Sequence, residues 1–214
     1  MNHPYRVRKH AAKVLLALVP LLFAAAAARG QDHAAGAQFG AGIWTLLRLD
    51  DVSVTVDDRS LEARLRGSPA TSLTYDYRLD PRWSVGAIAS HQALRLRDIR
   101  AVDGGADVSG TLRLTRVLLG VRGLVHYGPR DRRAVDLYSG LRAGLTVWSL
   151  GGSADLGTRD VDLDLFGLGV GGVTPQLTVI ALGYRHTVAE VVYLGAELAV
   201  GSPHFIAAQA GVRF

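Results

Sequence analysis

The chain has 214 residues, with 24 lysines and arginines against 19 acidic residues, and it contains no cysteine. The absence of cysteine excludes disulfide bonds and thiol chemistry. Five of the basic residues precede Gln31 and no acidic residue does, so residues 31–214 carry 19 charges of each sign. The basic character therefore belongs to the amino-terminal segment, and the rest of the chain gives no support to nucleic-acid binding.

The first 30 residues have the layout of a secretory signal. An apolar run, Val14–Ala28, is followed by small residues that suit cleavage by signal peptidase. The run is shorter than the ~20 residues that a membrane-spanning helix needs. Its basic flank consists of Arg6, Arg8, Lys9 and Lys13. We therefore predict a cleaved signal peptide over residues 1–30 and one exported domain over residues 31–214.

Beyond this segment, apolar residues recur at every second position, which is typical of strands with one apolar face. The clearest segment runs from Val135 to Val147, and the pattern also assigns Ile43 and Ile180 to the apolar face. No helical period persists. The eight alternating segments lie at about 38–44, 72–79, 83–90, 116–126, 135–147, 180–185, 192–200 and 206–214.

The links between these segments alternate in length. Short links fall at 80–82, 128–133 and 187–190, whereas the link at 201–204 is short although its place in the order predicts a long one. Long links are expected at about 50–70, 98–107 and 150–174. Short turns at one end, long loops at the other and an even number of strands describe a transmembrane barrel with both termini on the periplasmic side.

The second face of each strand is rich in glycine and carries isolated charges of both signs. A barrel of eight strands has an interior just wide enough for side chains to fill, so we expect these charges to pair with one another inside it. The predicted lumen network consists of Asp76, Arg78, Arg116, Arg122, Asp136, Arg142, Arg185, Glu197 and Arg213. The apolar face then meets lipid, and Tyr75, Tyr77, Trp83 and Tyr184 lie near the short turns, where an aromatic girdle is expected.

The signal, the eight segments, the sequence Tyr-Arg-Leu-Asp-Pro-Arg-Trp-Ser-Val-Gly (77–86) and the ending Ala-Gly-Val-Arg-Phe (210–214) resemble the small bacterial outer-membrane barrels of the OmpA/OmpX type. The resemblance implies an all-β fold, an eight-stranded antiparallel up-and-down transmembrane barrel, in a Gram-negative outer membrane. It also implies contact with lipid and lipopolysaccharide, and insertion by the barrel-assembly machinery, which recognises the last strand. The residues that would carry this assembly signal are Ala208, Ala210, Val212 and Phe214.

Three further motifs have weaker interpretations. Residues 167–172 satisfy a Gly-x-Gly-x-x-Gly pattern, but the strand and helix that a dinucleotide site needs are missing from the pattern around them. Asp160, Asp162 and Asp164 imitate the start of a calcium loop that lacks its later ligands. Ser202, His204 and Glu197 are the one set that combines a nucleophile, a base and an acid.

We expect no catalytic residue, cofactor or metal site, and a monomer whose role is structural or interactional through its outer loops. Three alternatives stay open at this point. The barrel could be a lipid A-modifying enzyme that uses Ser202, His204 and Glu197, or a narrow pore. The third alternative is a soluble periplasmic barrel that binds a ligand in an apolar lumen.

Overall fold

A computed structural model describes residues 33–46, 49–56, 59–101, 110–127, 134–154, 164–165, 168–169, 173–201 and 203–214. The predicted signal peptide lies outside the described residues. Among those described, no helix is long and apolar enough to cross a membrane.

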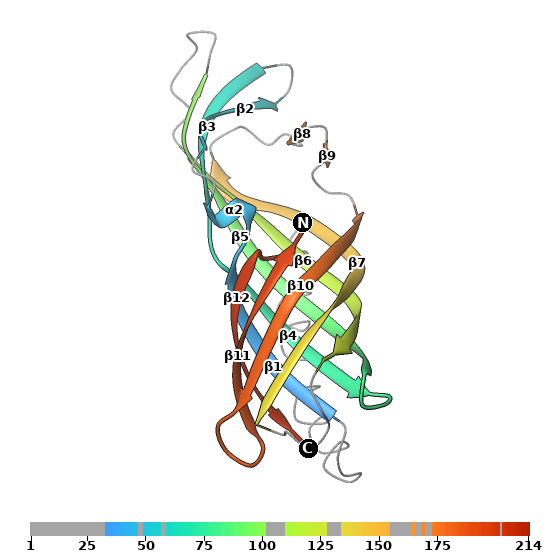
Figure 1. The fold of residues 1–214 in the computed structure, drawn as a ribbon. Coiled ribbons are helices and arrows are strands. Elements are labelled where there is room, and N and C mark those ends of the chain that lie inside the picture. Colours follow the sequence, from blue (N-terminus) through green and yellow to red (C-terminus); the bar gives the residue numbers. More distant parts are fainter. Residues whose placement is uncertain are drawn as a thin grey trace, which may run out of the picture.

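Eight strands close into one antiparallel barrel, as the sequence predicts (Figure 1). Each pairs with its neighbour along the barrel, and the last pairs with the first, so that Phe39 lies opposite Ala208. Closure leaves the barrel without an unpaired edge, which is a condition for strands that cross a membrane. The barrel strands are β1 (His33–Ala41), β4 (Ala70–Arg78), β5 (Trp83–Ala101), β6 (Gly110–His126), β7 (Val135–Ala154), β10 (Val173–Thr187), β11 (Val192–Val200) and β12 (Ile206–Arg213).

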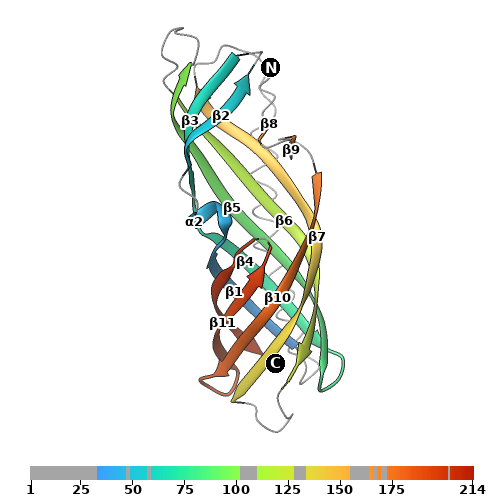
Figure 2. The same ribbon diagram turned by 45° about the horizontal axis from the view of Figure 1, so that its top comes forward.

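The strands differ greatly in length. β1, β4, β11 and β12 have eight or nine residues, whereas β5, β6 and β7 have 17 to 20. The long strands rise past the short ones at the long-loop end, where they continue as a sheet (Figures 1 and 2). Two further strands, β2 (Leu49–Val56) and β3 (Arg59–Gly67), form a hairpin, and β3 pairs with the upper half of β5. We call this part the extended wall: β2, β3, and residues 92–101, 110–116 and 148–154.

The predicted long loops are therefore partly strands. The expected loop at 50–70 is mostly the β2–β3 hairpin, β5 continues to Ala101, and β7 continues to Ala154. The prediction of loops was wrong here because the alternation in the extended wall is the reverse of that in the barrel. In the wall, leucines face inward and arginines face outward. Leu65, Leu94 and Leu96 are almost fully buried.

Two smaller predictions are wrong. β1 ends at Ala41 and Ile43–Leu46 forms a short helix, α2, so Ile43 does not belong to a strand. Ile180 was assigned to the outer face, but it is 1% exposed. The register of β10 shifts between Ile180 and Leu182 in its pairing with β11, so a bulge separates two stretches with opposite phase. Two further short strands, β8 (Asp164–Leu165) and β9 (Leu168–Gly169), pair with each other and form a separate small sheet.

The outer surface of the barrel is apolar and its interior is polar. Leu119, Val121 and Leu177 are 56%, 64% and 66% exposed, whereas Arg122 and Glu197 are 2% and 1% exposed. A soluble barrel would bury its apolar side chains, so this distribution excludes the soluble alternative and suits a lipid surround. Tyr77, Trp83 and Tyr184, near the short turns, are exposed on the lipid-facing side.

Candidate functional site: the charged lumen

Glu197, on β11, is the centre of the hydrogen-bond network in the lumen. Its Oε2 atom accepts hydrogen bonds from Tyr138 (3.0 Å), Gln38 (3.2 Å) and Arg122 (3.3 Å), and its Oε1 atom accepts one from Arg142. These donors come from three other strands of the barrel, β1, β6 and β7. A buried carboxylate is stable only when such donors replace the water that it loses. Glu197 therefore ties the strands together across the lumen.

Arg122 links Glu197 to a second carboxylate, Asp76, on β4. The Nε atom of Arg122 lies 3.1 Å from Asp76 Oδ1, and Arg185 donates a hydrogen bond of 2.6 Å to Asp76 Oδ2. All three side chains are at most 5% exposed. Because the pairs share members, removing one charge leaves more than one partner uncompensated.

Asp136, on β7, forms a third centre toward the short-turn end of the barrel. It accepts hydrogen bonds from His126 (2.8 Å), Arg213 (2.8 Å) and Arg78 (3.4 Å). Arg78 and Arg213 are about a quarter exposed, in contrast to the arginines deeper in the lumen. Among the described residues, five arginines contact these three carboxylates, so this group of side chains carries more positive than negative charges.

Two tyrosines fill space beside the ions. Arg185 lies over the rings of Tyr138 and Tyr193, at 4.7 and 5.0 Å from their centroids. Gly183 makes room for the first ring, since a Cβ atom there would lie 2.0 Å from a carbon of Tyr138. Gly36 does the same for the hydroxyl of Tyr193, at 2.2 Å. At these two positions, glycine on the inner face leaves room for a tyrosine ring from another strand: β7, next to β10, for Gly183, and β11, which is separated from β1 by β12, for Gly36.

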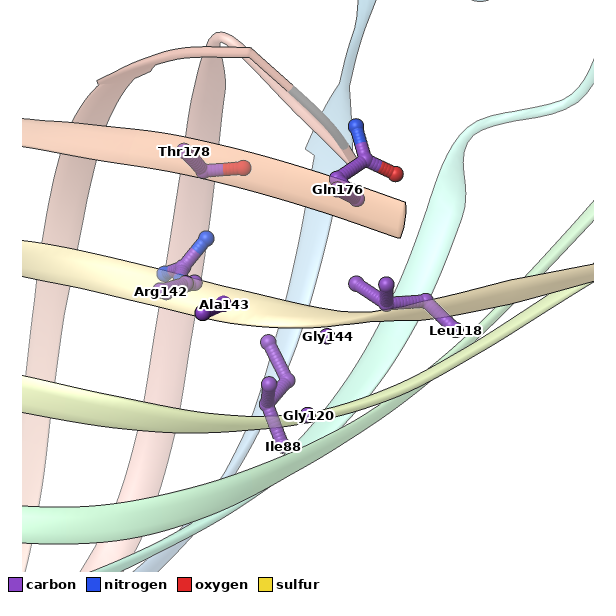
Figure 3. A pocket seen from close by; sticks show the side chains of 8 residues that line it. All are labelled: Ile88, Leu118, Gly120, Arg142, Ala143, Gly144, Gln176 and Thr178. Carbon is purple, nitrogen blue, oxygen red and sulfur yellow. The ribbon is translucent and has the colours of Figure 1, made fainter. Parts of the chain in front are cut away.

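Arg116 lies apart from the carboxylates. It donates hydrogen bonds to Gln92 and Gln176, and its guanidinium lies 5.4 Å from the ring centroid of Trp148. Between it and the charged centre, a small gap is lined by residues of β5, β6, β7 and β10 (Figure 3). The gap has no room for a water molecule. Its lining residues are Ile88, Leu118, Gly120, Arg142, Ala143, Gly144, Gln176 and Thr178.

His204, in the link between β11 and β12, is closer to the lumen network than the sequence indicates. The sequence places it in the short link at 201–204, between two strands; the side chain is fully buried, and its Nε2 atom lies 3.6 Å from Glu197 Oε1. Burial and the neighbouring Arg142 and Arg122 lower the pKa of His204 to about 3. The imidazole is therefore neutral at pH 7, and the contact with Glu197 is not an ion pair.

Several members of the network were not singled out in the sequence. Gln38, Gln209, Tyr138 and His126 all contribute hydrogen bonds to it. Gln38, Tyr138 and His126 lie on the polar face that the alternation defines. A position on that face therefore predicts membership of the lumen network better than a charged side chain does. Gln209 donates to Tyr138 at 2.8 Å and thereby holds its ring in place.

The other predicted sites divide into described and undescribed parts. Ser202 and the greater part of the two motifs at 160–164 and 167–172 lie outside the described residues. Ala208 and Ala210 are exposed on the outer face of β12, while Val212 and Phe214 are half-buried. Phe214 stacks on His33, with ring centroids 5.8 Å apart. Within the described part of the chain, no group of three or more histidines and carboxylates is arranged to hold a metal ion.

Comparisons with known proteins give similarity in structure and not in sequence. No model of a protein family matches the chain, and no curated protein matches it. The outer-membrane protein OprG from Pseudomonas aeruginosa is similar in structure, with a TM-score of 0.50 and 12% identity over 87% of this chain and 97% of that chain. This likeness, together with the closed barrel, shows the fold of a small outer-membrane barrel.

Two other solved structures are less similar. Ail, the attachment invasion locus protein of Yersinia pestis, in complex with the heparin analogue sucrose octasulfate, has a TM-score of 0.44 and 14% identity over 86% of this chain and all of that one. Neisserial surface protein A has a TM-score of 0.41 and 15% identity over 86% and 98%. The fold, its apolar outer surface and its polar lumen place this chain in an outer membrane.

Proposed function

We propose that this chain is a closed scaffold in the outer membrane, with a structural or surface-interaction role carried by the parts beyond its long-loop end. These parts are the extended wall and the links that the sequence places at 98–107 and 150–174. The long-loop end then faces outside, and the short turns face the periplasm. Binding residues commonly lie on loops that a rigid scaffold positions, and this barrel supplies such a scaffold.

The observation that carries the proposal is the filling of the lumen. Glu197 and Asp76 join strands of the barrel through the buried arginines Arg122, Arg142 and Arg185, and Asp136 does so through Arg78 and Arg213, which are about a quarter exposed. Eight strands leave little free space, and these pairs occupy it. A lumen filled in this way supports a role at the surface over a role in transport.

Conductance in planar lipid bilayers tests the proposal against the pore alternative. We expect no steady open channel from the purified protein, because the paired arginines and carboxylates block the path of ions. Steady openings of large conductance would contradict the proposal. A refolded outer-membrane porin in the same bilayers serves as the positive control, since it shows that insertion and recording work.

The enzyme alternative receives less support from the geometry. Glu197 is engaged by four hydrogen-bond donors, and His204 is fully buried and lies against Arg142 rather than facing lipid. A lipid-modifying centre must reach an acyl chain or its ester, which a buried imidazole does not. Mass spectrometry of lipid A from cells with and without the protein should therefore show the same acyl chains.

We also propose that the end of β12 is the segment that the barrel-assembly machinery recognises. Ala208, Ala210, Val212 and Phe214 lie at alternate positions, and the first two are exposed on the outer face of the strand. Replacing Phe214 with alanine should lower the amount of assembled protein in cells while leaving refolding in detergent intact. If refolding in detergent is lost as well, the residue acts on stability and not on recognition.

A further inference from the structure

A serine, a histidine and an aspartate form a chain of hydrogen bonds at the short-turn end of the barrel. Ser84 Oγ lies 2.9 Å from His126 Nε2, and His126 Nδ1 lies 2.8 Å from Asp136 Oδ1. They are the second residue of β5, the last of β6 and the second of β7, so three neighbouring strands place them at the lower end of the barrel in Figure 1. This set is not the one that the sequence singles out around the link at 201–204.

The chemistry of the groups fixes the direction of both hydrogen bonds. Arg78 and Arg213 also donate to Asp136, which is therefore an ionised carboxylate that only accepts hydrogen bonds. The neutral imidazole of His126 must then carry its proton on Nδ1, and its Nε2 atom accepts the proton of the Ser84 hydroxyl. Serine, histidine and aspartate joined in this order make a serine oxygen nucleophilic, and such a set is recognised by its geometry and not by sequence position.

Arg78, on β4, is a cationic neighbour of this set. It lies directly opposite Ser84 in the strand register, so the Cβ atoms of the two residues are about 5 Å apart. Its side chain is about a quarter exposed, and its hydrogen bond to Asp136 is 3.4 Å long. His126 and Arg213 bind the same carboxylate at 2.8 Å each. The guanidinium of Arg78 can therefore move without leaving Asp136 unpaired.

We propose that Ser84 is an activated nucleophile that cleaves small carboxylic esters, with His126 as its base and Asp136 as a positioning residue. The Ser84 oxygen attacks the carbonyl carbon of the ester, and its proton passes to His126 Nε2. The bond from that carbon to the alcohol oxygen breaks, and the alcohol leaves with the proton from His126. Water then attacks the acylated serine in the same way, which releases the acid and restores the hydroxyl.

Arg78 has two roles in this reaction. Ser84 is 2% exposed, so the ester enters from the short-turn end as the partly exposed guanidinium moves aside. The positive charge stays beside the carbonyl oxygen, where negative charge develops during the attack. Tyr138, two residues further along β7, is fully buried with its ring centroid 5.9 Å from that of His126. The lumen beyond the site is therefore filled, which limits the ester to a small acyl group.

The activity goes beyond the surface role proposed above and does not rest on it. The site lies at the end of the barrel opposite the extended wall, and detergent solution gives access to both ends. Loss of the surface role would therefore leave the activity unaffected, and loss of the activity would leave the surface role unaffected.

The test uses the full-length mature protein, refolded in detergent, and diisopropyl fluorophosphate, which transfers its phosphoryl group to activated serine hydroxyls with loss of fluoride. Peptide mass spectrometry of the unmodified protein should find that group on Ser84. Ser84→Ala should abolish labelling, and His126→Gln should slow it about a hundredfold or more, as expected when a general base is lost. Ser90→Ala is the matched control, because Ser90 is 5% exposed on the same face of β5 and lies opposite another serine. It should be labelled as the unmodified protein is.

Hydrolysis of p-nitrophenyl acetate then separates catalysis from a structural role. The unmodified protein and Ser90→Ala should release nitrophenol at the same rate, and Ser84→Ala should not exceed the rate in buffer. Asp136→Asn should lower kcat with little change in KM, because Asp136 positions the base without touching the ester. A gel-mobility shift on heating verifies that each variant is folded. Absence of label on Ser84 in the folded, unmodified protein would overturn the proposal. So would labelling of Ser84 that is equally fast in folded His126→Gln.

Discussion

The closed barrel and the extended wall use arginine in opposite ways. In the barrel, Arg122, Arg142 and Arg185 are 2% exposed and each contacts a carboxylate on another strand. In the wall, Arg95 and Arg113 are exposed and lie beside another arginine in the strand register. Arginine has the same charge in both regions, but in the barrel its partners are carboxylates of the protein itself. In the other region Arg95 and Arg113 are exposed at the surface of the sheet.

This difference explains why the barrel is expected to be stable by itself and the wall to depend on its surroundings. Buried ions are costly to leave unpaired, so the barrel must complete its network within the chain. Exposed arginines remain hydrated and cost less when unpaired, so the wall can keep them available. Substitutions in the two regions should therefore change the free energy of unfolding by different amounts and even in opposite directions.

The largest effect is expected from Glu197→Gln, which removes the charge that Arg122 and Arg142 share. Breaking a buried pair of this kind costs about 3–5 kcal/mol of unfolding free energy, because a buried charge is left uncompensated. Urea unfolding from lipid vesicles measures this loss. Glu190→Gln, in the exposed turn between β10 and β11, is the control and should change the unfolding free energy by less than about 0.5 kcal/mol. Similar values for the two variants would contradict a role for the network in stability.

A smaller effect is expected from Gly183→Ala, because the new methyl group overlaps the ring of Tyr138. Forcing an extra carbon into a filled interior costs about 1–3 kcal/mol. Gly123→Ala is a matched control, since a Cβ atom at Gly123 meets nothing within 4 Å. The same unfolding measurement applies, and adding Tyr138→Leu to Gly183→Ala should make the alanine less costly. If Gly183→Ala and Gly123→Ala lower the unfolding free energy by the same amount, the ring of Tyr138 does not require glycine at position 183.

The smallest effect, with the opposite sign, is expected from Arg113→Gln in a zwitterionic detergent, because Arg113 lies opposite Arg95 in the strand register. Removing one of two opposed like charges should raise the unfolding free energy by a few tenths of a kcal/mol, to about 1 at most. The gain should shrink as salt screens the repulsion. A loss of stability that salt does not alter would mean that Arg113 has an attractive partner within the protein.

The closed barrel could be predicted because its pattern is simple. Val135–Val147 alternates with one exception, Ser139, and an even number of such segments favours a closed barrel. The short turns also have a local cause: the Asp80 carboxylate accepts hydrogen bonds from the backbone of Arg82 (2.6 Å) and Trp83 (2.8 Å). This information is contained within a few neighbouring residues.

The extended wall could not be predicted, because its leucines and arginines reverse the faces that the barrel uses. Read with the rule of the barrel, Leu94 and Leu96 would face lipid, yet they are buried. Ile180 was misassigned for a related reason, since a bulge in β10 changes the phase of the alternation. The position of His204 depends on how the link after β11 folds into the lumen, which local pattern does not determine. Pairing between individual charges likewise depends on register, which sequence alone does not supply.

The filled lumen is tested most directly by the reactivity of a single cysteine placed inside it, which is feasible because the chain has none of its own. Ser72 is 1% exposed in the lumen, and Ala189 is exposed in the turn between β10 and β11. In the folded protein, a charged thiol reagent should modify Ala189→Cys rapidly and leave Ser72→Cys unmodified. After unfolding in urea, both should react. Modification of folded Ser72→Cys at a rate close to that of Ala189→Cys would show an open, water-filled lumen and contradict this account.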